Sequence, residues 1–298
     1  MAADIHSLNA QAAGERSVYL DAYLAPFREW LERDTVTEIL VNRPGEVWIE
    51  DAASPGMQKI ATPHIDNNLV QRLAEQVARR HWAMAIRRHR RLDLPLDAYD
   101  AGPLSQQAAA PMPDPQAEPI AYLREAIRQR RTILISGGTS TGKTTFLNAM
   151  LGEIPRQERV VLVEDTPELR LPGENGVGLV AVKGELGEAK VTANELLQAA
   201  LRLRPDRIVL GELRGAESVS FLRAINTGHP GSFSTIHANS LRGALEQLSL
   251  MVMQTGIGLT RSDTIAYAAS VIDVIVQLGR DANGKRGITQ IADSASLV

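Results

Sequence analysis

The pattern with the most specific chemistry in this sequence is a glycine-rich loop that ends in lysine and threonine. It reads Gly137-Gly138-Thr139-Ser140-Thr141-Gly142-Lys143-Thr144 and fits G-x-x-x-x-G-K-[ST]. An apolar run, TILIS, precedes the loop, and a helix-like run, KTTFLNAML, follows it. Loop amides and a helix N-terminus so arranged surround a β-phosphate. We therefore expect Lys143 on the β- and γ-phosphates of a nucleotide and the Thr144 hydroxyl on Mg²⁺; a chance glycine turn is the alternative.

Two apolar runs that end in carboxylates supply the acidic groups that such a loop needs. Residues 208–212, IVLGE, end in Glu212, and residues 160–165, VVLVED, end in Glu164 and Asp165. We expect Glu212 to orient or deprotonate the attacking water, and Glu164 and Asp165 to serve the metal and that water. For each carboxylate taken alone, the alternative is a solvated strand end.

Two of the six histidines lie in one short segment, GHPGSFSTIHA, at positions 229 and 237. The second follows a strand-like run, where an imidazole can sense a γ-phosphate by hydrogen bonding. Spacing alone favours a structural role instead. Metal ligation by the pair is not expected, because no carboxylate stands at helical spacing from them.

Residues 78–91, ARRHWAMAIRRHRR, combine six arginines with one tryptophan. Four interpretations remain open: binding to a nucleic-acid backbone, binding to an acidic membrane surface, contact with the phosphates of a nucleotide on another domain, and a solvated helix face.

Strand-like and helix-like runs alternate from about residue 119 to the end. The strand-like runs are apolar throughout, which is typical of a largely parallel sheet covered on both faces by helices. Thr192-x-x-Glu195 predicts a capping box at the start of one helix. We therefore expect an α/β fold in this part of the chain.

The chain before residue 101 has a different pattern. A helix is expected over residues 18–33, two short strands flank the turn Asn42-Arg43-Pro44-Gly45, and a second helix covers residues 67–80. Between residues 101 and 118 proline, alanine and glutamine dominate, as in a semi-extended linker. The predicted organisation is a small α+β domain at 1–100, a linker at 101–118 and an α/β domain at 119–298.

Composition narrows the class of protein. Of the 298 residues, 44% are hydrophobic and 22% charged, which is typical of a globular chain. The sequence has no cysteine, so disulfides, thiolate metal sites and cysteine nucleophiles are excluded, and a reducing compartment fits. The net charge of −3 gives no overall field for a polyanion. With no apolar run of membrane-spanning length and no signal-peptide pattern, we expect a cytoplasmic protein that its own chain neither exports nor anchors.

Four segments in order, GGTSTGKTT, VEDTPEL, RLRPDRIVLGELRG and GHPGSFSTIHANS, resemble the traffic ATPases of type IV secretion, the VirB-eleven type, within the secretion ATPase superfamily. The likeness spans residues 120–298, and VTEILVNRPGEVWIE extends it toward the N-terminus. It implies a RecA-like P-loop ATPase domain behind a smaller N-terminal domain. It also implies a homohexamer that hydrolyses ATP with Mg²⁺, works with other secretion subunits, and lies at the cytoplasmic side of the inner membrane.

The resemblance assigns a role to each motif. Residues 137–145, Thr145 included, form the phosphate loop; Glu164 and Asp165 form the Asp box; Glu212 ends the Walker B strand; and His229 with His237 form the His box. The resemblance therefore implies a catalytic role for His237. AMAIRRH resembles the segment in which an arginine of the N-terminal domain reaches the nucleotide phosphates, so Arg87 and Arg88 are the candidates.

In one respect the sequence departs from this family. Members place a longer β-rich stretch between the helix seen here as LVQRLAEQVAR and the arginine segment, so the N-terminal domain is expected to be shortened. A type II secretion or pilus motor and a RecA-like nucleic-acid motor are the alternatives. The absence of cysteine disfavours the motors that carry a tetracysteine zinc module, and direct nucleic-acid binding stays open.

Overall fold

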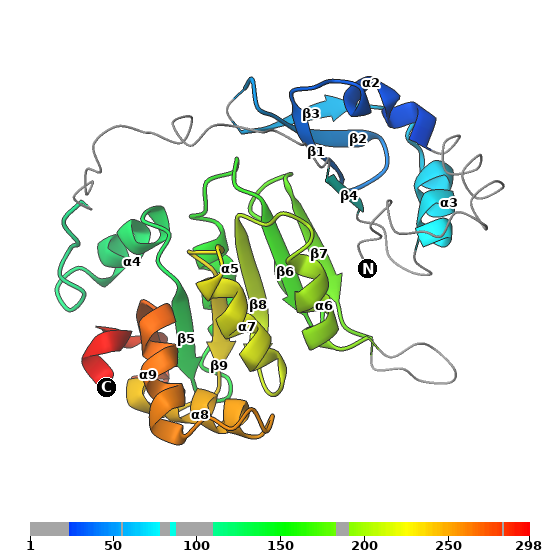
Figure 1. Cartoon of the computed structure of the whole chain (residues 1–298). Coiled ribbons are helices and arrows are strands. Elements are labelled where there is room, and N and C mark those ends of the chain that lie inside the picture. Colours follow the sequence, from blue (N-terminus) through cyan, green and yellow to red (C-terminus); the bar gives the residue numbers. More distant parts are fainter. Residues whose placement is uncertain (1–23, 55, 78–83, 88–109, 183–190, 282) are drawn as a thin grey trace, which may run out of the picture. The chain divides into compact units, whose positions relative to one another are not determined.

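The computed structural model describes residues 24–54, 56–77, 84–87, 110–182, 191–281 and 283–298 (Figure 1). The chain divides into two compact units, Met1–Ala110 and Pro111–Val298, and each is described by itself.

The first unit contains a four-stranded antiparallel sheet in the order β3-β2-β1-β4. Its strands are β1 (Val36–Val41), β2 (Glu46–Asp51), β3 (Met57–Ala61) and β4 (Met84–Arg87), and its helices are η1 (Ala25–Phe27), α2 (Arg28–Leu31) and α3 (Asn67–Val77). Within the described part of the helix expected at 18–33, the chain forms only a 3₁₀ turn and one helical turn. Pro26 stands at the start of that 3₁₀ turn, where its missing N–H cannot continue a longer helix.

The second unit is built on a seven-stranded sheet in the order β11-β10-β5-β9-β8-β6-β7. The strands are β5 (Ile133–Gly137), β6 (Val160–Glu164), β7 (Gly176–Val180), β8 (Arg207–Leu213), β9 (Phe233–Ile236), β10 (Val274–Arg280) and β11 (Arg286–Asp293). All are parallel except β11, which pairs antiparallel with β10. The predicted mixed α/β fold with a largely parallel sheet is confirmed for this unit.

Helices cover both faces of this sheet. The helices are α4 (Pro119–Arg128), α5 (Lys143–Leu151), α6 (Ala193–Ala200), α7 (Glu217–Asn226), α8 (Leu241–Met253) and α9 (Arg261–Val271), with a short η3 (Ser294–Leu297) near the end. Side chains of α4 and α5 pack with Ile133, Ile135 and Val276 on one face, and those of α6 to α9 pack with Leu134 and Ile275 on the other. The burial of successive strand residues on opposite faces explains why these strands are apolar throughout.

Two local predictions have a structural outcome. The capping box at the start of α6 is confirmed: Thr192 accepts a hydrogen bond from the Glu195 amide, and the Glu195 carboxylate accepts one from the Thr192 amide. Residues 111–118, which composition assigned to the linker, lie on the second unit. Met112 packs against the core, and the side-chain Nε2 of Gln116 donates to the Ile291 carbonyl at 3.0 Å. A proline-rich segment can therefore dock along a folded surface.

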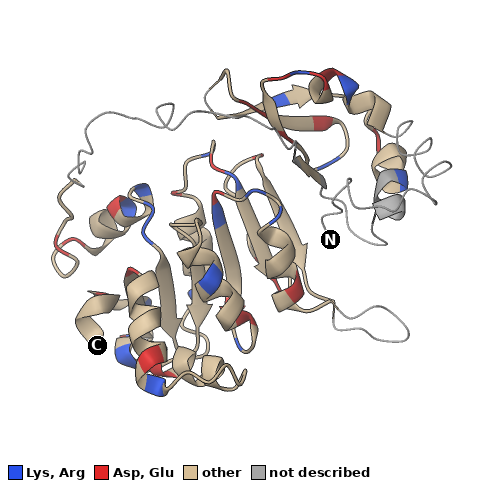
Figure 2. Cartoon of the chain, viewed as in Figure 1, with Lys and Arg blue, Asp and Glu red and all other residues tan. Residues whose placement is uncertain are grey.

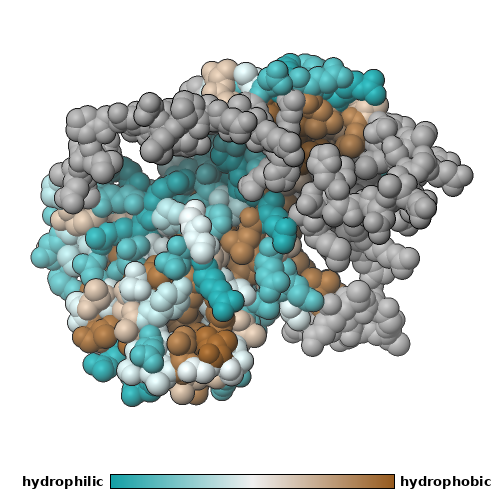
Figure 3. All heavy atoms as spheres, in the orientation of Figure 1, coloured by the Kyte–Doolittle hydropathy of each residue, from teal (hydrophilic) through white to brown (hydrophobic). Residues whose placement is uncertain are grey.

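The surface of the second unit mixes charge with a few apolar side chains. Figure 2 shows acidic and basic residues interspersed over its helices, in keeping with the small net charge. Leu250, Met253, Ile257 and Leu259 are exposed between the end of α8 and the start of α9, where Figure 3 shows hydrophobic surface at the lower end of the view. In the part of the chain that the structure describes, no helix combines the length and apolar character needed to cross a bilayer.

Candidate nucleotide site

The glycine-rich loop joins the end of β5 to the start of α5, at the carboxyl edge of the sheet. Its backbone turns through left-handed conformations at Ser140, with φ +61°, and at Gly142, with φ +91°. Glycine is suited to the second position because it has no Cβ to strain there. The Thr141 hydroxyl donates to the Gly138 carbonyl at 2.9 Å and closes the loop on itself.

Lys143, the first residue of α5, is buried, with 9% of its surface exposed. Its ammonium lies 2.9 Å from the carbonyl oxygen of Gly137, 3.2 Å from that of Gly138 and 3.2 Å from Nδ1 of His237. An ammonium has three N–H donors, so two loop carbonyls and the His237 imidazole use all three. A phosphate that binds here must take over some of these contacts.

The charges around Lys143 affect its pKa in opposite directions. Burial lowers the pKa most, the nearby charge of Glu212 raises it, and that of Arg214 lowers it again, with a net decrease. The normal pKa of a lysine lies near 10.5, and the decrease reflects the cost of burying a cation.

His237 links the lysine to the carboxylate at the end of β8. The ammonium is only a donor, so Nδ1 accepts from it and the ring proton is on Nε2. That Nε2 lies 2.7 Å from Oε1 of Glu212. The structure thus brings together Lys143, His237 and Glu212, which lie on three different strand-to-helix segments of the sequence.

Glu212 contacts a second cation, which the sequence analysis did not identify. Its Oε2 accepts from Nε of Arg214 at 2.7 Å and forms an ion pair with Nη2 at 2.5 Å. Nη1 of Arg214 lies 3.5 Å from Oδ2 of Asp165. The hydrogen bond to Glu212 is the main reason that the pKa of Arg214 is raised. A signal existed, because residues 212 and 214 fall on the same side of an extended chain.

Glu164 lies beside this chain of contacts but uses one oxygen for the backbone. It is 6% exposed, and its Oε1 accepts from the amides of Glu168 at 2.9 Å and Leu169 at 2.8 Å. A Cβ on Gly211, in the neighbouring strand, would lie 3.6 Å from its Cγ. Glu164 therefore supports the turn after β6 and borders the Walker B strand; its predicted catalytic role stays a prediction.

The two histidines of the GHPGSFSTIH segment lie at opposite ends of β9: His229 precedes the strand and His237 follows it. Nδ1 of His229 lies 3.0 Å from the carbonyl oxygen of Pro205, to which it donates. Burial lowers the pKa of His229. The structure does not bring this histidine to the phosphate loop, whereas it does bring His237.

The arginine segment is only partly described. Arg87 is the last residue of β4, and Arg88 lies outside the described residues. Their predicted contact with nucleotide stays a prediction, as do the other interpretations of residues 78–91.

Oxygen donors suitable for magnesium are present beside the loop. Thr144 is half-buried and Thr145 exposed in the first turn of α5, and Asp165 follows β6. Over the described ranges, no cluster of three or more histidine, cysteine, aspartate or glutamate side chains is arranged to hold a metal. A cation here would rely on one hydroxyl, one carboxylate and phosphate oxygens, which suits Mg²⁺.

Comparison with known proteins agrees with this geometry. The family described as "Type II/IV secretion system protein" matches residues 110–294. The type IV secretion system protein PtlH of Bordetella pertussis is 36% identical over 324 residues, covering 91% of this chain and 93% of the relative. VirB11 of Bartonella quintana is 43% identical over 174 residues, covering 58% of this chain and 49% of the relative. The crystal structure of the VirB11 ATPase of the Brucella suis type IV secretion system, in complex with sulphate, superposes with a TM-score of 0.84 at 28% identity, covering 97% and 98% of the two chains.

The chain therefore belongs to the type II/IV secretion system protein family. Within that family it is an ATPase of the type IV secretion kind, as the motifs predicted. The alignment with PtlH spans 26 positions more than the 298 residues of this chain, so the relative has at least that many residues in the aligned region that this chain lacks.

Proposed function

We propose that this chain is a Mg²⁺-dependent, RecA-like P-loop ATPase that drives transport or assembly in a type IV secretion or conjugal transfer system. It acts as a homohexamer, with other secretion subunits, on the cytoplasmic side of the inner membrane. The observation that carries the proposal is the chain of contacts from Lys143 through His237 to Glu212, since it joins the phosphate-binding lysine to the carboxylate that acts on water.

The phosphate loop holds the nucleotide. Amides of residues 137–145 and the N-terminus of α5 surround the β-phosphate, and Lys143 exchanges its carbonyl contacts for β- and γ-phosphate oxygens. Thr144 and Asp165 would hold Mg²⁺, which would neutralise charge on the phosphate oxygens. Asp165 lies 3.5 Å from Nη1 of Arg214, at the long end of the ion-pair range, so its carboxylate could also serve a cation.

Glu212 acts as the base or orienting group for the attacking water, with Glu164 beside it. His237 lies between the two charged groups, because its Nδ1 accepts from the Lys143 ammonium and its Nε2 lies 2.7 Å from Oε1 of Glu212. When Lys143 moves to the γ-phosphate, Nδ1 loses its donor. His237 can therefore report phosphate binding to Glu212, which fits the sensing role expected of it.

The arginine segment supplies a further nucleotide contact in this proposal. Arg87 or Arg88 contacts the nucleotide phosphates, and the N-terminal domain is shortened before the arginine segment.

Replacement of Glu212 by Gln tests the proposal. Gln keeps the shape of the side chain and an oxygen that can accept from Arg214, but the group loses its negative charge and its basicity. We expect ATP binding to persist while turnover falls by about 10²- to 10⁴-fold. Glu246→Gln, on α8, is the matched control, since that carboxylate pairs only with surface arginines among the described residues.

Turnover near the wild-type rate in Glu212→Gln would contradict the assignment and transfer the role to Glu164. Loss of ATP binding together with turnover would show instead that Glu212 holds the site together or holds the metal.

A further inference from the structure

We propose that Arg286, on the hairpin formed by β10 and β11, is a further nucleotide-contacting residue. It reaches, from within the same chain, the phosphates held by the loop, and Arg280 positions the loop for this contact. The inference rests on the proposed function in one respect, namely that residues 137–145 bind phosphates.

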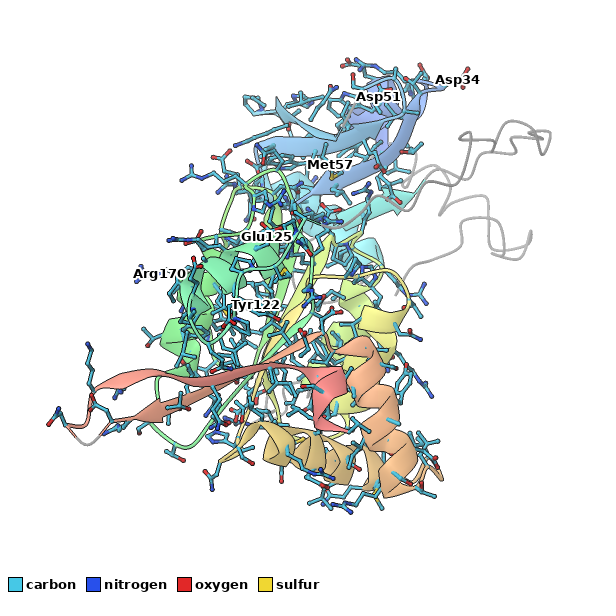
Figure 4. All side chains as sticks on the ribbon, turned by 90° about the vertical axis from the view of Figure 1, so that its left-hand side faces the viewer. Asp34, Asp51, Met57, Tyr122, Glu125 and Arg170 are labelled. Atoms are coloured by element: carbon cyan, nitrogen blue, oxygen red, sulfur yellow. The ribbon has the colours of Figure 1, made fainter. Side chains whose placement is uncertain are left out.

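The hairpin lies beside the loop in the sheet. β10 is the direct neighbour of β5, and Leu278 pairs with Gly137, the residue at which the loop begins. At the far end of the ladder Arg280 pairs with Arg286. Figure 4 shows the two strands projecting from the second unit as a ribbon, with the turn that joins them at its tip.

The register places both arginines on the face of the sheet that carries α5. Leu278 and Ile288 pack in the core layer under α4 and α5. Side chains two residues apart in a strand lie on the same face, so Arg280 and Arg286 share that face. This is also the face from which α5, beginning at Lys143, presents its N-terminus.

Two contacts bring these arginines to the loop itself. Nη2 of Arg280 donates to the carbonyl oxygen of Ser140 at 2.8 Å, at the residue with φ +61°. Cδ of Arg286 lies 3.3 Å from the point that a Cβ on residue 142 would occupy. The aliphatic part of the Arg286 side chain therefore packs against Gly142, the residue just before α5. Its guanidinium is close enough to contact a phosphate bound by the loop amides.

Among the described residues, no carboxylate forms an ion pair with Arg286. The side chain is exposed, and within the described ranges it forms no ion pair or side-chain hydrogen bond. Arg214, on the opposite side of the site, is instead engaged by Glu212 and Asp165. A planar guanidinium with five donors matches phosphate oxygens, so the geometry gives the nucleotide a cation on the hairpin side of the loop.

The test compares binding of ADP and of inorganic pyrophosphate to the full chain. Arg286→Gln keeps most of the stem and removes the charge; Arg286→Lys keeps the charge; Lys285→Gln removes one charge from the neighbouring hairpin residue. We expect Arg286→Gln to weaken both ligands by about tenfold or more, the usual worth of a charge-assisted hydrogen bond. Arg286→Lys should recover part of the loss, and Lys285→Gln should change either affinity by less than twofold.

Several results would overturn the inference. Equal affinities for Arg286→Gln and wild type would do so, as would an equal loss in Lys285→Gln, which would reveal only the general charge of the hairpin. Weaker ADP binding with unchanged pyrophosphate binding would place Arg286 on the nucleoside instead of the phosphates. Failure of the phosphate-loop assignment is distinguished by Lys143→Ala: if that variant binds pyrophosphate as well as the wild type does, the loop itself is not the site.

Discussion

Replacing Glu158 by Gln tests how the strand that carries Glu212 is anchored. Arg207, the first residue of β8, is fully buried and lies against this carboxylate, with Nε 2.7 Å from Oε2 and Nη2 3.0 Å from Oε1. Carbonyl oxygens of Ile127, at 2.8 Å, and Gly231, at 3.2 Å, accept two more of its N–H donors. The substitution keeps the shape of the side chain and leaves the guanidinium buried without a countercharge.

Glu158→Gln should lower the free energy of unfolding substantially, although the two side chains have nearly the same shape. Breaking a buried ion pair by removing one partner costs about 3 to 5 kcal/mol, and the two carbonyl contacts that Arg207 keeps favour the lower end. For a unit of this size, about 3 kcal/mol corresponds to a fall in Tm of about 6 to 12 °C. Glu153→Gln is the control, because its pair with Arg124 is exposed and worth at most about 1 kcal/mol.

The assay is thermal unfolding followed by circular dichroism at several pH values. Burial by itself raises the pKa of Glu158, but hydrogen bonds from Arg207 and Arg130 lower it by more, so the net pKa lies below the usual 4.5. A carboxyl whose folded pKa is lowered contributes its stability above the unfolded pKa and loses it as the pH falls through the folded value. The gap between wild type and Glu158→Gln should therefore be full at pH 7 and close progressively below about pH 4.5.

A Tm within 2 °C of wild type at pH 7 would refute the reasoning. So would a gap that persists unchanged at low pH, because a difference independent of protonation cannot come from the carboxylate charge. The double variant Glu158→Gln with Arg207→Met should recover much of the loss, since removing both partners of a buried pair is far less costly than removing one.

Two further predictions concern the site itself. Lys143→Ala should abolish ATP turnover and leave the far-ultraviolet circular dichroism spectrum unchanged, because loop amides alone do not neutralise the β- and γ-phosphate charge; turnover at the wild-type rate would contradict the phosphate-loop assignment. Replacing both Arg87 and Arg88 by Ala should weaken ATP affinity or turnover and leave single-stranded DNA binding nearly unchanged. A fall of about 1.4 in the salt slope of DNA affinity, with ATPase kinetics intact, would instead favour a nucleic-acid track.

Most of the second unit could be predicted from the sequence because its strands are apolar throughout. The runs TILIS, VVLVE and IVLGE became β5, β6 and β8 with small shifts at their ends. Two edge strands were not predicted. β7 is short and carries two glycines, and β11 is largely exposed, so neither shows the continuous apolar pattern of a buried parallel strand.

The candidate site could also be predicted only in part from the sequence. The glycine, lysine and carboxylate positions of the local motifs were identified because a few consecutive residues determine the geometry of a strand-loop-helix segment. The partners of these residues were not, since Lys143 meets His237 across 94 positions of sequence and Arg280 meets Ser140 across 140. Only the order of strands in the sheet brings such pairs together.

The strands β8 and β9 each separate a residue at the amino end of the strand from a residue of the site at its carboxyl end. β8 begins at the buried Arg207 and carries Glu212 five residues later, about 16 Å along an extended chain. β9 likewise separates His229, held by the carbonyl of Pro205, from His237 at the site. Each strand is thus fixed at its amino end by buried or half-buried polar contacts and presents a reactive group at its carboxyl end. We therefore expect the contacts of Arg207 and His229, at the amino ends of β8 and β9, to help to position Glu212 and His237 at the carboxyl ends.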